Sequence, residues 1–72
     1  MEKKITEIPI NTEFIKLDSM LKFAGAVESG GFAKSVIQEG LVKVNGEVCV
    51  QRGKKMFRGD TVQFNDLVFR VV

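Results

Sequence analysis

The side chains of this 72-residue chain that could do chemistry are mostly basic and gather in its second half. The whole chain has 11 lysines and arginines against 9 acids, a net charge of only +2. Between residues 34 and 58 the bases clearly outnumber the acids, which favours a surface that binds a polyanion. A solvated charged face is the alternative, and charge alone leaves both open. The bases of this segment are Lys34, Lys43, Arg52, Lys54, Lys55 and Arg58.

A serine followed by two glycines, at residues 29–31, is the most suggestive local feature. Glycines at the start of a helix leave backbone N–H groups open to an anion, and the helix dipole favours negative charge there. Lys34, one turn further on, could share the same phosphate. The alternative is that the glycines only permit the turn between two helices.

Catalytic and metal chemistry are not predicted. The chain has no histidine, so neither a Ser–His nor a Cys–His nucleophile pair can be built. The single cysteine excludes an internal disulfide, and a structural zinc site lacks its ligands. The carboxylates are scattered, and local spacing places no pair for acid–base work. We therefore expect a protein that is not an enzyme and takes no metal, cofactor or small-molecule substrate.

The elements that must position these residues are organised around the segment from residue 29 to residue 46. Ser29 is a good helix N-cap, because its hydroxyl can accept a hydrogen bond from the first turn. Lys34 and Gln38 are four residues apart and lie together on a wetter face of the helix. Gly40 ends the helix in the left-handed conformation. The apolar face, read from helical spacing, consists of Phe32, Ala33, Val36 and Ile37.

A β-hairpin is predicted directly after this helix, from Val42 to Val50. Asn45-Gly46 is the strongest short signal for a two-residue hairpin loop. The register puts Cys49 on the valine face, which favours a buried structural thiol over a reactive one. The cross-strand pairs are Val44 with Glu47, Lys43 with Val48, and Val42 with Cys49.

The flanking segments complete an α+β fold, in which two short helices pack on a small, mainly antiparallel sheet. Ile5–Ile10 reads as an edge strand, because Pro9 does not fit a central one. Apolar spacing from Leu17 to Ala24 indicates an amphipathic helix, and residues 51–55 form a polar loop. Asn65-Asp66 predicts a second hairpin. Its core face is expected to carry Val62, Phe64, Leu67, Phe69 and Val71.

The length allows one domain only, which we expect to span residues 1–72. The longest apolar runs are a few residues, so neither a transmembrane helix nor a signal-peptide core is expected.

An ordered set of residues between about Ile15 and Val62 resembles the S4 RNA-binding domain. Two stretches are also similar to those of small free-standing bacterial S4-like proteins: Ser-Gly-Gly-x-Ala-Lys at residues 29–34 and Arg-Gly-Lys-Lys at residues 52–55. No single piece of the set is specific, but the order is. The set comprises Leu17-Asp18, Leu21, Ser29, Ala33, Ile37, Gly40, Val42, Val44-Asn45-Gly46 and Gly59-Asp60.

The resemblance implies a binding face formed by the helices and the first hairpin. Lys16 stands where the family commonly has an arginine before Leu-Asp, so the charge is kept with less bidentate capacity. Gly30 replaces the arginine that often follows the serine in the family. The expected phosphate contact therefore depends more on backbone N–H groups and on Lys34. The RNA-binding residues expected on this basis are Lys16, Ser29, Gly30, Gly31, Lys34, Gln38, Lys43, Arg52, Lys54 and Lys55.

The implied partner is structured RNA, with ribosomal RNA or tRNA and hence the ribosome as candidates, in a bacterial cytoplasm and without a membrane. The chain has six phenylalanines and no tyrosine or tryptophan, and most phenylalanines fall on predicted core faces. Stacking on bases is therefore poorly provided for, and recognition would use backbone and shape. The rival is a protein-interaction adaptor that kept the S4 fold without RNA binding. The low net charge, the missing arginine and the acidic first third of the chain favour that rival.

Overall fold

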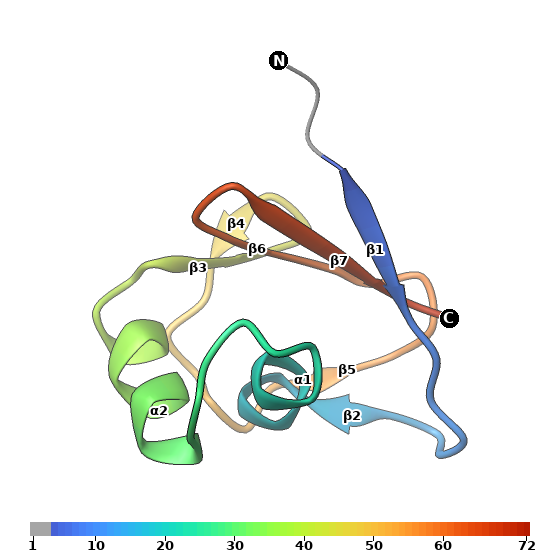
Figure 1. The fold of residues 1–72 in the computed structure, drawn as a ribbon, viewed down its shortest axis with the longest axis horizontal. Helices are drawn as coiled ribbons and strands as arrows, with labels where there is room; N and C mark the ends of the chain where they lie inside the picture. Colours follow the sequence, from blue (N-terminus) through green and yellow to red (C-terminus); the bar gives the residue numbers. More distant parts are fainter. Residues whose placement is uncertain (1–3) are drawn as a thin grey trace.

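Both helices lie on one face of a five-stranded sheet (Figure 1) in the computed structural model, which describes residues 4–72. The strand order is β1-β7-β6-β3-β4, with β1 parallel to β7 and the other pairs antiparallel. β2 and β5 form a separate antiparallel pair, here called the β2–β5 ribbon. The expected α+β architecture is confirmed. The elements are β1 (Ile5–Ile8), β2 (Ile15–Lys16), α1 (Leu17–Phe23), α2 (Gly30–Gln38), β3 (Val42–Val44), β4 (Glu47–Val48), β5 (Lys55–Met56), β6 (Thr61–Phe64) and β7 (Leu67–Val71).

Helix α2 begins and ends as its sequence predicts. The Oγ of Ser29 accepts a hydrogen bond of 3.1 Å from the N–H of Phe32, and Gly40 has φ +77° just past the last turn. Ala33 lies at the centre of the buried stripe. The prediction that Phe32 shares this core face is wrong, because its side chain is 49% exposed. Phe32 lies in the first turn of α2, outside the residues of that helix that are buried.

Both hairpins have the predicted register. Val44 pairs with Glu47 in the first, where Asn45 and Gly46 take positive φ angles of 50° and 87°. The second hairpin turns at Asn65, with φ 56°, and its pairs also agree with the prediction. Leu67 is the exception on the second core face, since it follows the turn at the sheet margin and is 45% exposed.

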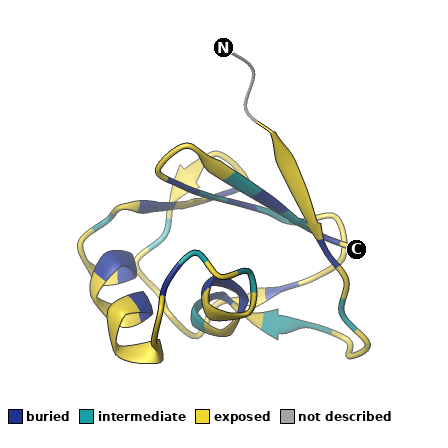
Figure 2. Ribbon diagram, viewed as in Figure 1, coloured by how far each residue is buried: buried dark blue, intermediate teal, exposed yellow. Residues whose placement is uncertain are grey.

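One apolar core joins the sheet, the two helices and the β2–β5 ribbon (Figure 2). Met56 of the ribbon is fully buried and extends the core beyond the main sheet. β1 is an edge strand, as expected, and ends before Pro9. Each fully buried aliphatic side chain of this size contributes roughly 1.5–3 kcal/mol. The largest fully buried side chains are Leu17, Met20, Leu21, Ile37, Met56, Val42, Val62 and Val71.

The phenylalanines do not follow the prediction that most of them fill the core. Only Phe64 and Phe69, both in the second hairpin, are buried. Phe23, at the end of α1, is 64% exposed. The aliphatic residues and Met56 already fill the small space between sheet and helices, so the remaining rings stay at the surface. The argument that stacking on bases is poorly provided for therefore loses its premise, which was that most of the rings are buried.

No helix within residues 4–72 has the length and apolar character needed to cross a membrane.

Candidate nucleic-acid interface

All ten residues predicted to bind RNA are exposed in the structure. They lie on the β2–β5 ribbon, the loop between β4 and β5, helix α2 with its N-cap, and strand β3. Burial therefore prevents none of them from contacting a ligand. The structure brings some of them close together and separates others.

Four bases lie on the β2–β5 ribbon and on the loop that precedes β5, and are here called the loop–ribbon cluster: Lys16, Arg52, Lys54 and Lys55. Lys16 and Lys55 are cross-strand partners in the β2–β5 ribbon. The prediction that Lys55 lies in the polar loop is wrong, because it is the first residue of β5. Arg52 and Lys54 precede it on the loop between β4 and β5.

Backbone hydrogen bonds fix this loop against the start of α1. The N–H of Leu17 donates to the carbonyl of Lys54 at 2.9 Å, and the N–H of Asp18 donates to the carbonyl of Arg52 at 3.1 Å. Lys16 is the N-cap residue of α1 and supplies no side-chain cap. The loop carbonyls thus satisfy N–H groups that the first turn leaves unpaired. Two of the four bases are thereby anchored beside Lys16 through their own main chain.

Like charges directly opposite each other on neighbouring strands destabilise a sheet. Lys16 opposite Lys55 is such a pair. The ammonium of Lys55 lies 4.9 Å from the centroid of the Phe14 ring, an attractive cation–π distance that offsets part of the repulsion. A phosphate placed between the two lysines would remove the rest. The ribbon therefore carries two adjacent lysines whose mutual repulsion is only partly offset within the protein.

The start of α2 is a second exposed feature. The Oγ of Ser29 already accepts a hydrogen bond from the N–H of Phe32. Gly30 and Gly31 lie between these two residues, in the first turn of the helix. A Cβ added at Gly30 would meet nothing within 4 Å, so the backbone there is open to close approach. Lys34 and Gln38 lie exposed on the same helix, which packs against α1.

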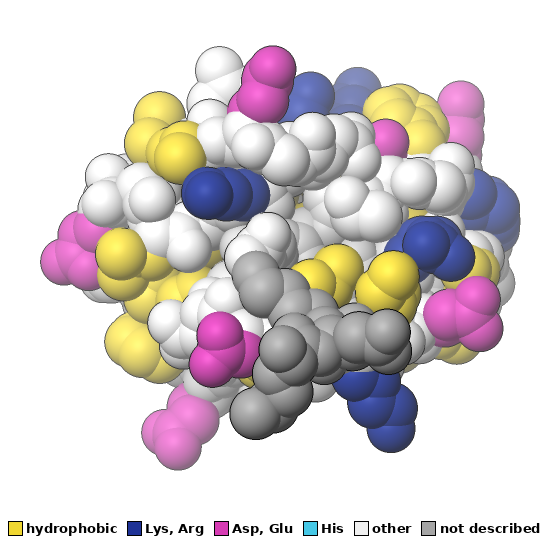
Figure 3. Space-filling model, turned by 90° about the horizontal axis from the view of Figure 1, so that it is seen from above, with side chains coloured by type: hydrophobic (Ala, Val, Ile, Leu, Met, Phe, Trp, Pro, Cys, Tyr) yellow, Lys and Arg dark blue, Asp and Glu magenta, His cyan; other side chains and the backbone are white. Residues whose placement is uncertain are grey.

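Lys43 lies on a different side of the molecule from the helices. Its neighbours Val42 and Val44 face the core, so the Lys43 side chain points to the outer face of the sheet. Figure 3 views the molecule from above, on this sheet side, where acidic and basic side chains are interspersed. The sequence placed Lys43 in one group with the bases of the loop. In the structure the sheet separates Lys43 from them.

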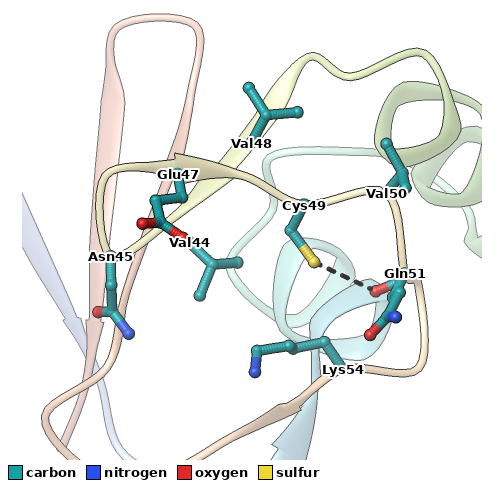
Figure 4. Close-up of a pocket in the computed structure, with 8 residues that line it drawn as sticks. All are labelled: Val44, Asn45, Glu47, Val48, Cys49, Val50, Gln51 and Lys54. Atoms are coloured by element: carbon teal, nitrogen blue, oxygen red, sulfur yellow. Dashed lines mark hydrogen bonds between the residues drawn. The ribbon is translucent and has the colours of Figure 1, made fainter.

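An open groove of about 520 Å³ lies between the first hairpin and the loop (Figure 4). Val44, Cys49 and Lys54 are among its lining residues. The thiol of Cys49 donates to the carbonyl of Gln51 at 3.8 Å. Cys49 packs against the core but is only half-buried, so the expectation of a buried thiol is wrong. It follows β4, which lies at the edge of the sheet and is paired, within residues 4–72, with β3 on one side only.

The sequence matches the S4 domain family over residues 8–72. The chain belongs to the S4 domain family. It is 45% identical over 56 residues to the "Probable ribosome maturation protein RlbA" of Bacillus subtilis strain 168, with 78% of this chain and 79% of that protein covered. It is 44% identical over 50 residues to the "Putative RNA-binding protein YbcJ" of Escherichia coli K12, with 69% of this chain and 71% of that protein covered. The resemblance stated from motif order is confirmed.

Two motif residues of this S4 domain connect its turns. The Oδ1 of Asn45 accepts from the N–H of Thr61 at 2.9 Å, and its Nδ2 donates to Asp60 at 3.2 Å. The other carboxylate oxygen of Asp60 accepts from the N–H of Phe57 at 2.8 Å. The first hairpin is thereby tied to the turn before β6. The prediction that Asn45 and Gly46 form the hairpin loop is confirmed by their positive φ angles.

Arg58 of the S4 domain holds the turn after β1. Its guanidinium donates to the carbonyls of Ile10 at 2.7 Å and Thr12 at 3.1 Å. This basic residue was counted in the basic segment, but its hydrogen bonds are internal. Across residues 4–72, no group of three acids or cysteines is placed as metal ligands would be.

Proposed function

We propose that this S4 domain is a non-catalytic RNA-binding module that docks on structured RNA through the loop–ribbon cluster. The pairing of Lys16 with Lys55 carries the proposal, because two lysines held in register suit a phosphate between them. The backbone bonds from the loop to α1 support it, since they hold two further bases nearby. The family match and the name of the E. coli relative also support RNA binding.

The docking face includes, in this proposal, the exposed side of α2 and its N-cap as a second contact. Its residues are Ser29, Gly30, Gly31, Lys34 and Gln38. Lys43 contacts only RNA that wraps around the sheet edge, because its side chain points to the outer face. Residues 1–72 act as a single domain in this account.

Ribosomal RNA is the proposed target ahead of tRNA. The B. subtilis relative is named a ribosome maturation protein, which supports a role on the ribosome and a location in the cytoplasm. The relatives come from two bacteria, which supports a bacterial setting. A comparison of binding to purified ribosomal RNA and to bulk tRNA tests the choice.

The salt dependence of binding tests the cluster itself. If its four bases each neutralise one phosphate, the plot of log K against log salt should slope at roughly −3 to −4. Changing both Lys54→Gln and Lys55→Gln should flatten the slope by roughly 1.5 to 2. These side chains are exposed and the loop is held by its carbonyls, so stability should change little.

The matched control changes Lys4→Gln and Lys22→Gln, an equal loss of charge at exposed sites outside the cluster. This control variant should keep most of the salt slope of RNA binding that the parent protein shows. Equal losses in both double variants would mean a diffuse attraction without a defined face. If the parent protein shows no salt-sensitive binding to any structured RNA, the protein-adaptor function replaces this one.

A further inference from the structure

Two phenylalanines lie on the exposed face of the β2–β5 ribbon beside the two lysines. Ile15 pairs with the buried Met56, so the residues on either side of this pair point outward. Phe14 therefore lies across from Phe57, with ring centroids 5.9 Å apart and planes tilted by 52°. The Lys55 ammonium is 4.9 Å from the Phe14 centroid, which confirms that the two share a face.

The two rings are not equally exposed. Phe57 is 44% exposed, whereas Phe14 is half-buried beneath Lys55. Phe14 thus supports Phe57 in a tilted ring contact, while Phe57 keeps 44% of its surface exposed. Phe57 is not part of the buried core, whereas the adjacent Met56 is. An exposed ring, a supporting ring and two ammonium groups therefore meet on one small surface.

We propose that the exposed ring of Phe57 is a stacking platform for one unpaired base of the bound RNA. The ammonium groups of Lys55 and Lys16 would hold the phosphate next to that base. Every base has a π-face, so such a platform is tolerant of sequence and combines naturally with a basic groove. The inference rests on the proposed RNA-binding function and adds that the target has an unpaired nucleotide at the docking site.

The lysines identify the occupant of the platform. A wholly apolar peptide segment would leave two adjacent ammonium groups uncompensated at the margin of its contact. A nucleotide supplies both the flat apolar surface and the negative charge. Simple cross-strand packing of Phe14 and Phe57 is the competing explanation, and it predicts a role in stability alone.

A short RNA hairpin with a pair of unpaired adenosines at its 3′ end tests the platform against the same hairpin with those positions abasic. The intact protein should bind the adenosine hairpin roughly five- to a hundredfold more tightly, the range that a base–aromatic stack supplies. Phe57→Leu keeps an apolar side chain and should abolish this preference. Phe23→Leu, at an exposed phenylalanine on α1, should retain it.

Tryptophan fluorescence gives a second readout that does not depend on the stability of the leucine variant. The chain has no tryptophan or tyrosine, so Phe57→Trp introduces a single reporter. The adenosine hairpin should quench its emission much more than the abasic one. Salt-sensitive binding of both hairpins without preference or differential quenching would overturn the platform and leave the proposed function standing. No binding of either hairpin or of ribosomal RNA would overturn both.

Discussion

The backbone N–H of Leu17 donates a 2.9 Å hydrogen bond to the carbonyl oxygen of Lys54. A helix that lacks a side-chain cap is thereby capped by a loop more than thirty positions later in the sequence. The main chain alone makes this contact, so the charge on the Lys54 side chain can change without loosening α1. Binding and folding can therefore be tested separately at this site.

Lys16→Glu should make the protein more stable and weaken its binding to RNA. The change converts a like-charge pair with Lys55 into an opposite-charge pair, and it places an acid at the start of α1. Together these effects should raise the free energy of unfolding by about 0.5–2 kcal/mol. The salt slope of RNA binding should fall by about 1. Urea unfolding and RNA titration measure the two quantities.

Lys16→Gln is the control for that variant, because it removes the repulsion without adding an attraction. It should gain less stability than Lys16→Glu and lose a similar part of the salt slope. A loss of stability in both variants would show that Lys55 is already satisfied by Phe14 and that the pair is not strained.

Gly30→Asp should weaken RNA binding while the fold stays intact. An acid in the first turn of α2 suits the helix dipole, so stability should be unchanged or slightly raised. The carboxylate would occupy the position proposed for a phosphate. Gly30→Ala is the matched control, since its Cβ would meet nothing within 4 Å. Equal affinities of the two variants for ribosomal RNA would leave the glycines with a turn-forming role only.

Local signals in the sequence were sufficient to predict most of the elements. The Ser29 cap, the left-handed Gly40 and the two hairpin turns each depend on the conformational preference of one or two residues. Such preferences act within a few residues, so they can be read from the local sequence alone. The hairpin registers followed from turn length alone.

The β2–β5 ribbon could not be predicted in the same way. Each strand has only two residues, and about forty residues separate the two strands, so neither gives a periodic pattern. Their pairing results from the core burying Met56 and from the loop capping α1. The candidate site depends on this pairing. The sequence therefore supplied candidate basic residues but could not show that Lys16 faces Lys55.

The misplaced phenylalanines have a related cause. Periodicity marks a ring as facing the sheet or helix interior but does not say how much space the interior offers. In a domain of this length the core is small, and aliphatic side chains fill it. Phe32 and Phe57 remain outside as a result.

Asn45 provides a last test, which separates architecture from RNA contact within the family motif. Asn45→Gly keeps the positive φ but removes the side-chain hydrogen bonds to Thr61 and Asp60. The free energy of unfolding should fall by about 1–2 kcal/mol. Asn65→Gly is the matched control at the other hairpin turn, where φ is 56°, and should change stability by less than about 0.5 kcal/mol.

Both glycine variants should bind ribosomal RNA like the parent protein at a temperature where each is folded. The side chain of Asn45 is directed at Thr61 and Asp60, which leaves its amide little capacity for a ligand. A large loss of affinity in the folded Asn45→Gly variant, with unchanged unfolding free energy, would mean that the motif asparagine contacts RNA directly. Parallel losses of stability and affinity on warming would instead show that the hairpin must stay tied to β6 for the protein to bind.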